Sequence, residues 1–76
     1  MLLKTFDKVN TAVKTNYTVY DANDNPIDFF TVDYTAGGTH VVDKIDLIDA
    51  GATVRFVSVY QDHLEVSVNL PEGWIA

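Results

Sequence analysis

The sequence predicts a small α+β domain dominated by β-structure: a mainly antiparallel sheet of four or five strands with one or two short helices. Three observations support this class. Apolar and polar residues alternate in one segment, β-branched and aromatic residues fill others, and one short stretch carries helix-capping residues at both ends. The chain of 76 residues is expected to form one domain, residues 1–76, with a core of marginal size. A small all-β barrel is the alternative.

A β-hairpin over residues 53–70 is the clearest predicted element. Apolar residues at positions 64, 66, 68 and 70 alternate with polar ones, which is typical of a half-buried strand. Residues 53–60 are rich in β-branched and aromatic side chains, and residues 61–63, Gln-Asp-His, favour a turn between the two strands.

A second strand pair is expected nearer the N-terminus. Residues 17–21 and 27–34 have the composition of strands, and turn-forming residues 23–26 separate them. A further turn is expected at residues 36–38, where two glycines tolerate positive φ, and it leads into a strand over residues 39–42.

Residues 43–51, DKIDLIDAG, predict a short helix. Asp43 can cap its N-terminus, Asp46 falls in its first turn, and Gly51 stands where a glycine commonly ends a helix. The side chains expected on its apolar face are Val42, Ile45 and Ile48. An alternating strand over the same residues stays open as a second interpretation.

Residues 2–15 fit two different structures. A helical stripe is formed by Leu2, Phe6, Val9 and Val13. β-branched or aromatic residues also occupy every second position from 9 to 19, which is typical of a strand. We expect a strand or a short helix at the start, followed by a strand that has begun by Tyr17.

Two of the predicted strands are apolar on both faces. In residues 27–34 the odd-numbered apolar residues, beginning with Ile27, point to one face, and the even-numbered ones, beginning with Phe30, point to the other. Residues 54–60 are apolar in the same two-sided way. Short helices can cover one face of such a sheet. The second face then requires barrel closure, a partner protein or a second copy of the chain.

The charge and composition exclude several classes of function. The formal net charge is −6, and such a surface repels nucleic-acid phosphates and anionic membranes. We therefore expect no direct nucleic-acid binding and no membrane binding, and a partner with a basic surface is favoured instead. No apolar run is long enough to span a bilayer, and the first residues lack the features of a signal peptide. A cytoplasmic location is expected.

The stretch DANDNP, residues 21–26, has the acidic spacing with which a calcium-binding loop begins. Counted from Asp21, however, the sixth residue is Pro26 where an EF-hand needs glycine, and the twelfth is Val32 where it needs a bidentate acid. We therefore expect a turn in which Asp and Asn side chains bond the local backbone, with Pro26 starting the next strand.

No other motif predicts catalysis or a bound cofactor. His40 and His63 lack a third ligand at a spacing that zinc requires. Ser58 and Ser67 lie within predicted strands, outside any nucleophile elbow. There is no cysteine. We expect no enzyme activity, no metal and no cofactor.

The partner-binding residues are predicted from charge and aromaticity. If residues 43–51 are helical, three acids recur every three residues and form a slanted row of carboxylates that could occupy a basic groove. Aromatic side chains are the usual apolar contacts at binding sites. The predicted contact residues are Asp43, Asp46, Asp49, Phe30, Tyr34 and Trp74. Trp74 could alternatively fold back over the end of the core.

These observations predict a non-catalytic protein-binding module. The form favoured by the charge is a small acidic inhibitor or modulator that engages a basic surface, such as that of a nucleic-acid-handling protein. The alternative is a homo-oligomeric structural subunit, such as a dimer, that uses an aromatic face of its sheet as its own interface.

Overall fold

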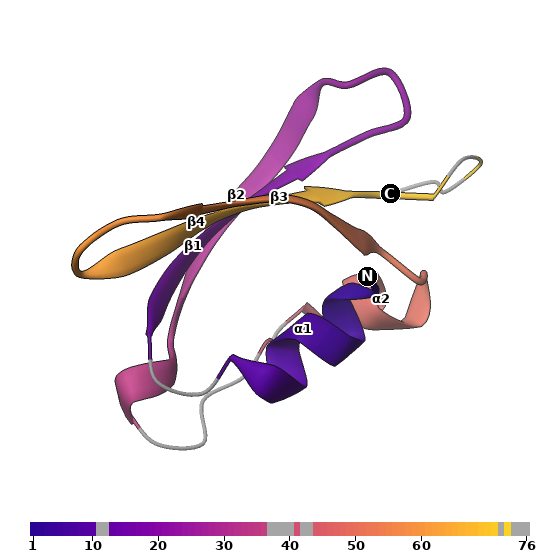
Figure 1. Cartoon of the computed structure of the whole chain (residues 1–76). Helices are drawn as coiled ribbons and strands as arrows, with labels where there is room; N and C mark the ends of the chain where they lie inside the picture. Colours follow the sequence, from indigo (N-terminus) through magenta and orange to yellow (C-terminus); the bar gives the residue numbers. More distant parts are fainter. Residues whose placement is uncertain (11–12, 37–40, 42–43, 72, 74–76) are drawn as a thin grey trace.

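The fold is an open four-stranded sheet with two short helices on one side (Figure 1), which confirms the expected α+β class. The computed structural model describes residues 1–10, 13–36, 41, 44–71 and 73. Its elements are, in chain order, helix α1 (Leu3–Val9), strands β1 (Lys14–Tyr20) and β2 (Pro26–Asp33), the 3-10 turn η1 (Tyr34–Ala36), helix α2 (Ile45–Asp49), and strands β3 (Thr53–Val59) and β4 (His63–Asn69).

Two antiparallel hairpins make up the sheet, and a parallel strand pair joins them. The strand order is β2-β1-β4-β3, with β1 antiparallel to β2 and β3 antiparallel to β4. The central pair, β1 and β4, is parallel, with Lys14 opposite His63 and Tyr20 opposite Asn69. The barrel alternative is wrong, because β2 and β3 lie at opposite edges of an open sheet and four strands are too few to close around a packed interior.

Helix α1 resolves the ambiguity of the first segment in favour of a short helix. The expected apolar stripe is displaced by one residue, because Leu3 is fully buried whereas Leu2 and Val9 are 47% and 67% exposed. Phe6 does pack against the core as predicted. With only two turns, the helix buries one narrow line of side chains, so a shift of one position changes which residues face the sheet.

Helix α2 is confirmed, and its C-terminal signal is confirmed with it. Gly51 adopts φ +78°, its N–H donates to the Ile48 carbonyl (3.1 Å), and the N–H of Ala52 donates to the Leu47 carbonyl (3.1 Å). This pair of bonds defines a Schellman motif. The expected apolar face was wrong in part, since Leu47 is buried and Ile45 is 54% exposed. The predicted cap Asp43 and the predicted strand over 39–42 fall mostly outside the described residues.

The core lies between the helices and one face of the sheet, here called the inner face. Alternate residues of the central strands, such as Tyr17 and Val19 on β1 and Val66 and Val68 on β4, supply most of it. Leu3 of α1 and Leu47 of α2 complete it from the other side, while Val32 and Leu70 extend it along the sheet. The opposite, outer face is polar along β1 and β4, where Asn16, Thr18, Glu65 and Ser67 lie in adjacent register.

A buried chain of polar side chains ties α1 to the sheet. The Tyr17 hydroxyl donates to the Tyr34 hydroxyl (2.5 Å), which donates to Oδ1 of Asp7 (2.5 Å). The Asp7 carboxylate also accepts from the N–H of Val41 (3.2 and 3.3 Å). Burial raises the pKa of Tyr34 well above its usual value, and the bond to the Asp7 carboxylate raises it further because both favour the neutral phenol.

The two strands predicted to be apolar on both faces are the two edge strands, β2 and β3. The side chains on their inner faces differ in burial. Val32 of β2 is buried, whereas Val57 and Val59 of β3 are 43% and 78% exposed. In Figure 1 the helices lie below the sheet, and the hairpin of β3 and β4 extends past the end of α1. The helical layer is therefore too short to cover the β3 edge.

The left-handed backbone at Gly51 yields a stability prediction. We expect Gly51→Ala to lower the free energy of unfolding by about 1 kcal/mol, because an L-residue is strained at positive φ. No atom lies within 4 Å of an added Cβ, so the loss comes from the backbone and not from a clash. Gly51→Asn is the matched control, and urea unfolding should show a smaller loss because Asn tolerates this conformation. Equal losses for both variants would contradict the backbone explanation.

The buried tyrosine pair predicts a loss of stability at high pH. Because the folded state raises the pKa of Tyr34 above its usual 10.0, the stabilising contribution is complete below that value and is lost as the pH rises above it. Thermal unfolding followed from pH 8 to about pH 11 should therefore show a falling melting temperature. Tyr34→Phe should lower stability near neutral pH by about 1–3 kcal/mol and flatten the alkaline fall.

Tyr60→Phe is the control for that titration, because its ring is 54% exposed at the end of β3. We expect this variant to keep the alkaline fall of the parent protein. An alkaline fall that is equally steep in the Tyr34→Phe variant would refute the assignment to Tyr34.

Candidate functional site

The turn between β1 and β2 is held by its own side chains, as the sequence predicted. Oδ1 of Asp21 accepts from the N–H groups of Asn23 and Asn25, both at 2.9 Å. Asp24 adopts φ +66°, and Pro26 is the first residue of β2, at the edge of the sheet. One oxygen of the Asp21 carboxylate thus accepts hydrogen bonds from the local backbone. This confirms the predicted turn in which an Asp side chain bonds the backbone that follows it.

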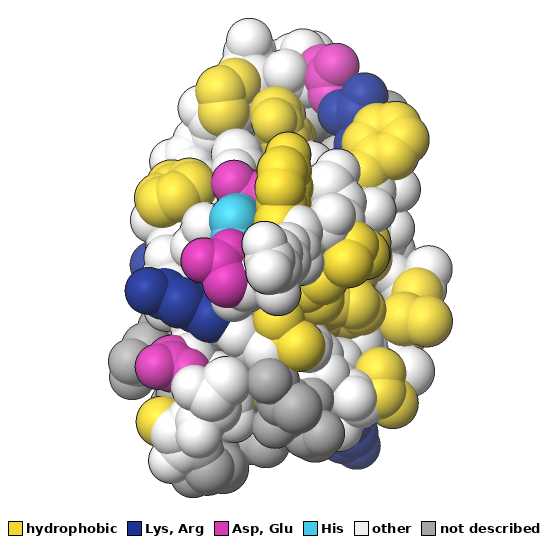
Figure 2. Space-filling model, turned by 60° about the vertical axis from the view of Figure 1, so that its left-hand side comes forward, with side chains coloured by type: hydrophobic (Ala, Val, Ile, Leu, Met, Phe, Trp, Pro, Cys, Tyr) yellow, Lys and Arg dark blue, Asp and Glu magenta, His cyan; other side chains and the backbone are white. Residues whose placement is uncertain are grey.

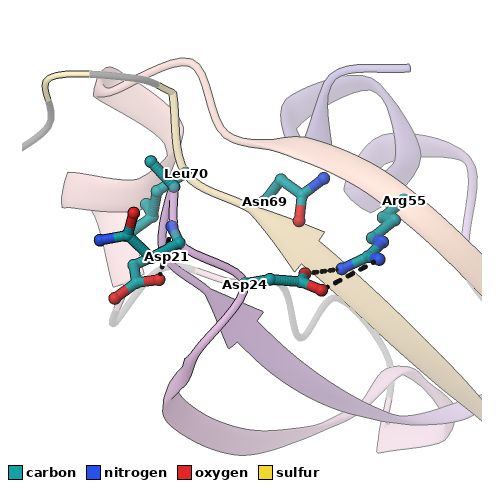
Figure 3. Close-up of a pocket in the computed structure, with 7 residues that line it drawn as sticks. Asp21, Asp24, Arg55, Asn69 and Leu70 are labelled. Atoms are coloured by element: carbon teal, nitrogen blue, oxygen red, sulfur yellow. Dashed lines mark hydrogen bonds and ion pairs between the residues drawn. The ribbon is translucent and has the colours of Figure 1, made fainter.

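A shallow hollow lies beside this turn (Figure 3). It has a volume of about 700 Å³ and is lined by Asp21, Ala22, Asn23, Asp24, Arg55, Asn69 and Leu70. The Arg55 guanidinium forms an ion pair with the Asp24 carboxylate and lies over the rings of Tyr20 (5.6 Å) and Phe56 (5.2 Å). These contacts connect the turn between β1 and β2 to β3 across the outer face. The charged side chains of Asp24 and Arg55 in the hollow therefore already stabilise the fold.

The tip of the hairpin of β3 and β4 carries a second polar cluster. Nδ1 of His63 lies 2.7 Å from Asp62, and its ring stacks on Tyr60 with centroids 4.7 Å apart. The hydrogen bond from His63 lowers the pKa of the exposed Asp62 carboxyl. Among the described residues, no three His, Cys, Asp or Glu side chains are grouped so that they could hold a metal ion.

The predicted contact residues are dispersed over the fold. Asp46 and Asp49 are exposed on α2, and they are the only members of the predicted acidic row whose structure is described. Phe30 is half-buried, stacked on Tyr17 (5.0 Å) with the Lys44 ammonium over its ring (5.2 Å). Asp43 and Trp74 lie outside the described residues.

The expectation that Tyr34 contacts a partner is corrected by its burial. Its side chain is 2% exposed and its hydroxyl is bonded to Tyr17 and Asp7. Even-numbered residues at this end of β2 and η1 point to the inner face, under the helices, so the aromatic groups chosen from the sequence belong to the covered side of the strand.

The exposed apolar side chains gather instead on the β3 edge, which we call the β3 surface: Phe56, Val57, Val59 and Tyr60, exposed by 62%, 43%, 78% and 54%. Figure 2 looks onto this end of the molecule and shows hydrophobic side chains grouped next to the hairpin tip, where His63 is cyan. Val57 and Val59 lie on the inner face opposite Val66 and Leu64, and Phe56 lies on the outer face opposite Ser67.

The other edge strand, β2, is protected in ways that the β3 surface is not. It begins with Pro26, which has no N–H to offer a partner strand, and it carries Asp28 and Asp33. Asp28 is paired with Lys44 (3.0 Å), and that hydrogen bond lowers the pKa of the Asp28 carboxyl. Residues 56–60 of the β3 edge contain no charge and no proline. An unprotected edge of this kind is a template for pairing with another strand.

Comparisons with protein families, with curated proteins and with solved structures find no match to this chain. Within the described residues, no helix is long and apolar enough to cross a membrane.

The geometry of the first turn predicts how it responds to substitution and to calcium. Asp21→Ala should lower the free energy of unfolding by about 1–2 kcal/mol, because two backbone N–H groups lose their acceptor. Asp21→Asn keeps an acceptor oxygen and should cost less. Millimolar calcium should leave the melting temperature of the parent protein unchanged. A calcium-dependent rise that is lost in Asp21→Asn would contradict the turn assignment.

Proposed function

We propose that the protein is a non-catalytic protein-binding module that binds through the β3 surface. The observation that carries the proposal is the unprotected edge of β3, with four large apolar side chains exposed by 43–78% on both faces of one strand. A partner strand added at such an edge gains backbone hydrogen bonds, and the alternate side chains supply apolar contacts on each face. The polar groups near this edge, by contrast, are engaged in contacts that support the fold.

A partner with a basic surface is favoured by the distribution of charge. The chain carries a net charge of −6, and its two bases beyond residue 20, Lys44 and Arg55, are already paired with Asp28 and Asp24. Asp46 and Asp49 remain exposed on α2. Electrostatic attraction would then accelerate the approach of a basic partner, while the β3 surface supplies the apolar contacts. Bound in this way, the small acidic module would act as an inhibitor or modulator of its partner.

Capture from an extract of the source cell tests this proposal with matched surface variants. The test variant is Phe56→Ser combined with Val59→Ser on the β3 surface. Its control is Ile27→Ser combined with Phe29→Ser, which removes side chains of similar exposure (46% and 64%) from the opposite edge. We expect the β3 variant to lose captured protein and the β2 variant to retain it. A partner held equally well by both variants would place binding away from β3.

A charge test separates the role of the acids. We expect Asp46→Asn combined with Asp49→Asn to weaken the captured complex several-fold at low salt and to have less effect at high salt, because screening weakens exposed charge pairs. A partner whose affinity does not depend on salt or on these acids would rule out the basic-surface part of the proposal and leave the β3 surface as the binding site.

A further inference from the structure

We propose that the strand that pairs with β3 is the β3 strand of a second copy of this chain, arranged antiparallel around Ser58. This inference rests on the proposed function, since it names the occupant of the same surface; with β3 occupied by that copy, a basic partner would contact the dimer through the acids of α2 instead. Residues 56–60 read Phe-Val-Ser-Val-Tyr, so the types of side chain are symmetric about Ser58. In a two-fold interface residue i of one copy meets residue j of the other and j meets i, so a segment that is symmetric about its centre places similar side chains opposite each other.

The backbone of β3 is arranged to accept this pairing. The N–H of Tyr60 donates to the His63 carbonyl (3.0 Å), which makes residues 60 and 63 a hydrogen-bonded pair of the hairpin. In an antiparallel ladder, hydrogen-bonded and non-hydrogen-bonded residue pairs alternate. Residues 58 and 56 therefore also point their backbone N–H and C=O groups toward β4. The N–H and C=O groups of Val57 and Val59 therefore point to the free edge.

The free part of the edge has a defined start. The N–H of Val54 donates to the Met1 carbonyl (2.8 Å), and Leu2 forms an isolated bridge with Thr53, so the first residues of the chain occupy the edge at the beginning of β3. Among the residues that the structure describes, none pairs with this edge in the stretch from Arg55 onward. A pairing centred on Ser58 uses residues 56–60, and all of them lie within that stretch.

Only one register satisfies both faces of the strand. With Ser58 on the axis, Val57 pairs with Val59 of the second copy through backbone bonds on the inner face, and Phe56 meets Tyr60 of the second copy on the outer face. A shift that centres Val57 would place Phe56 opposite serine and Tyr60 opposite Val54, whose N–H is already used. A shift that centres Val59 would place Phe56 opposite Asp62. Of these three registers, the Ser58 register is the one in which each apolar residue of 56–60 meets another apolar residue, while Ser58 meets its own counterpart.

The paired segment itself carries no charged side chain. Arg55 of one copy comes opposite Gln61 of the other, next to Asp62, whose side chain is 88% exposed. Arg55 keeps its own ion pair with Asp24, and residues 56–60 are uncharged. Two chains of net charge −6 therefore meet along a segment that has no charged side chain of its own. Asp46 and Asp49 lie outside the paired strands, so a basic partner can still approach the dimer at α2.

Disulfide cross-linking tests the register directly, because the chain contains no cysteine of its own. On the axis, the two copies of residue 58 form a non-hydrogen-bonded pair with Cα atoms about 4.5 Å apart, within the range for a disulfide. We expect Ser58→Cys, treated with oxidised glutathione, to convert from 8.5 kDa to a species of twice that mass. Conversion should be roughly tenfold faster than for Phe29→Cys, an exposed position on the other edge.

A mixing experiment distinguishes this register from non-specific collision. Phe56→Cys and Tyr60→Cys should each cross-link slowly alone, because each introduced thiol faces an aromatic ring in its own dimer. An equimolar mixture should cross-link at least several-fold faster, because the two thiols then face each other. Rates for the mixture equal to the mean of the separate variants would overturn the register, and circular dichroism confirms that each variant is folded.

Sedimentation of the parent protein separates failure of this inference from failure of the proposed function. A monomer at every concentration, together with slow Ser58→Cys cross-linking, would overturn the self-pairing. If the Phe56/Val59 variant still loses a captured partner in that case, the β3 surface remains the binding site of another protein. If it loses nothing, the binding function of β3 is refuted as well.

Discussion

The fold depends on one constraint: its helices can cover only part of one face of the sheet. Helices of seven and five residues are about 10 and 8 Å long, whereas a seven-residue strand extends for about 23 Å. The chain places this short layer over the two central strands, where Tyr17, Val19, Val66 and Val68 are buried. The bonds from Tyr17 through Tyr34 to Asp7 hold α1 in that position. Everything beyond the reach of the helices, above all the β3 edge, is left to solvent or to another chain.

Much of the architecture could be predicted from local patterns, and what could not be predicted is non-local. Alternation and turn chemistry identified both hairpins, and Gly51 marked the end of α2. The predicted buried face of α1 began one residue too early, at Leu2 instead of Leu3. Both residues are equally apolar, and only the position of the helix over the sheet decides which one is buried. The parallel pairing of β1 with β4 has no local signal, since any strand of suitable pattern could have occupied the centre.

The candidate surface shows the same division between local and non-local information. The two-sided apolar character of residues 27–34 and 54–60 was visible in the sequence, and both segments form edge strands with exposed apolar side chains. Which aromatic groups remain exposed was not visible. Phe30 and Tyr34 face the helices, while Phe56 and Tyr60 face outward, and that choice follows from strand order. The turn at Asp21, in contrast, was predictable because its bonds are made within five residues.

The parallel pair at the centre of the sheet also determines when the core can form during synthesis. Residues of β1 and their partners on β4 are about fifty positions apart. Forming this strand pair therefore costs the entropy of closing a long loop before its contacts can stabilise the structure. The hairpin of β1 and β2 leaves the ribosome first and can pair locally. It presents the core side of Tyr17 and Val19 to water until β4 pairs with β1, so this apolar surface is exposed during the interval between the two events.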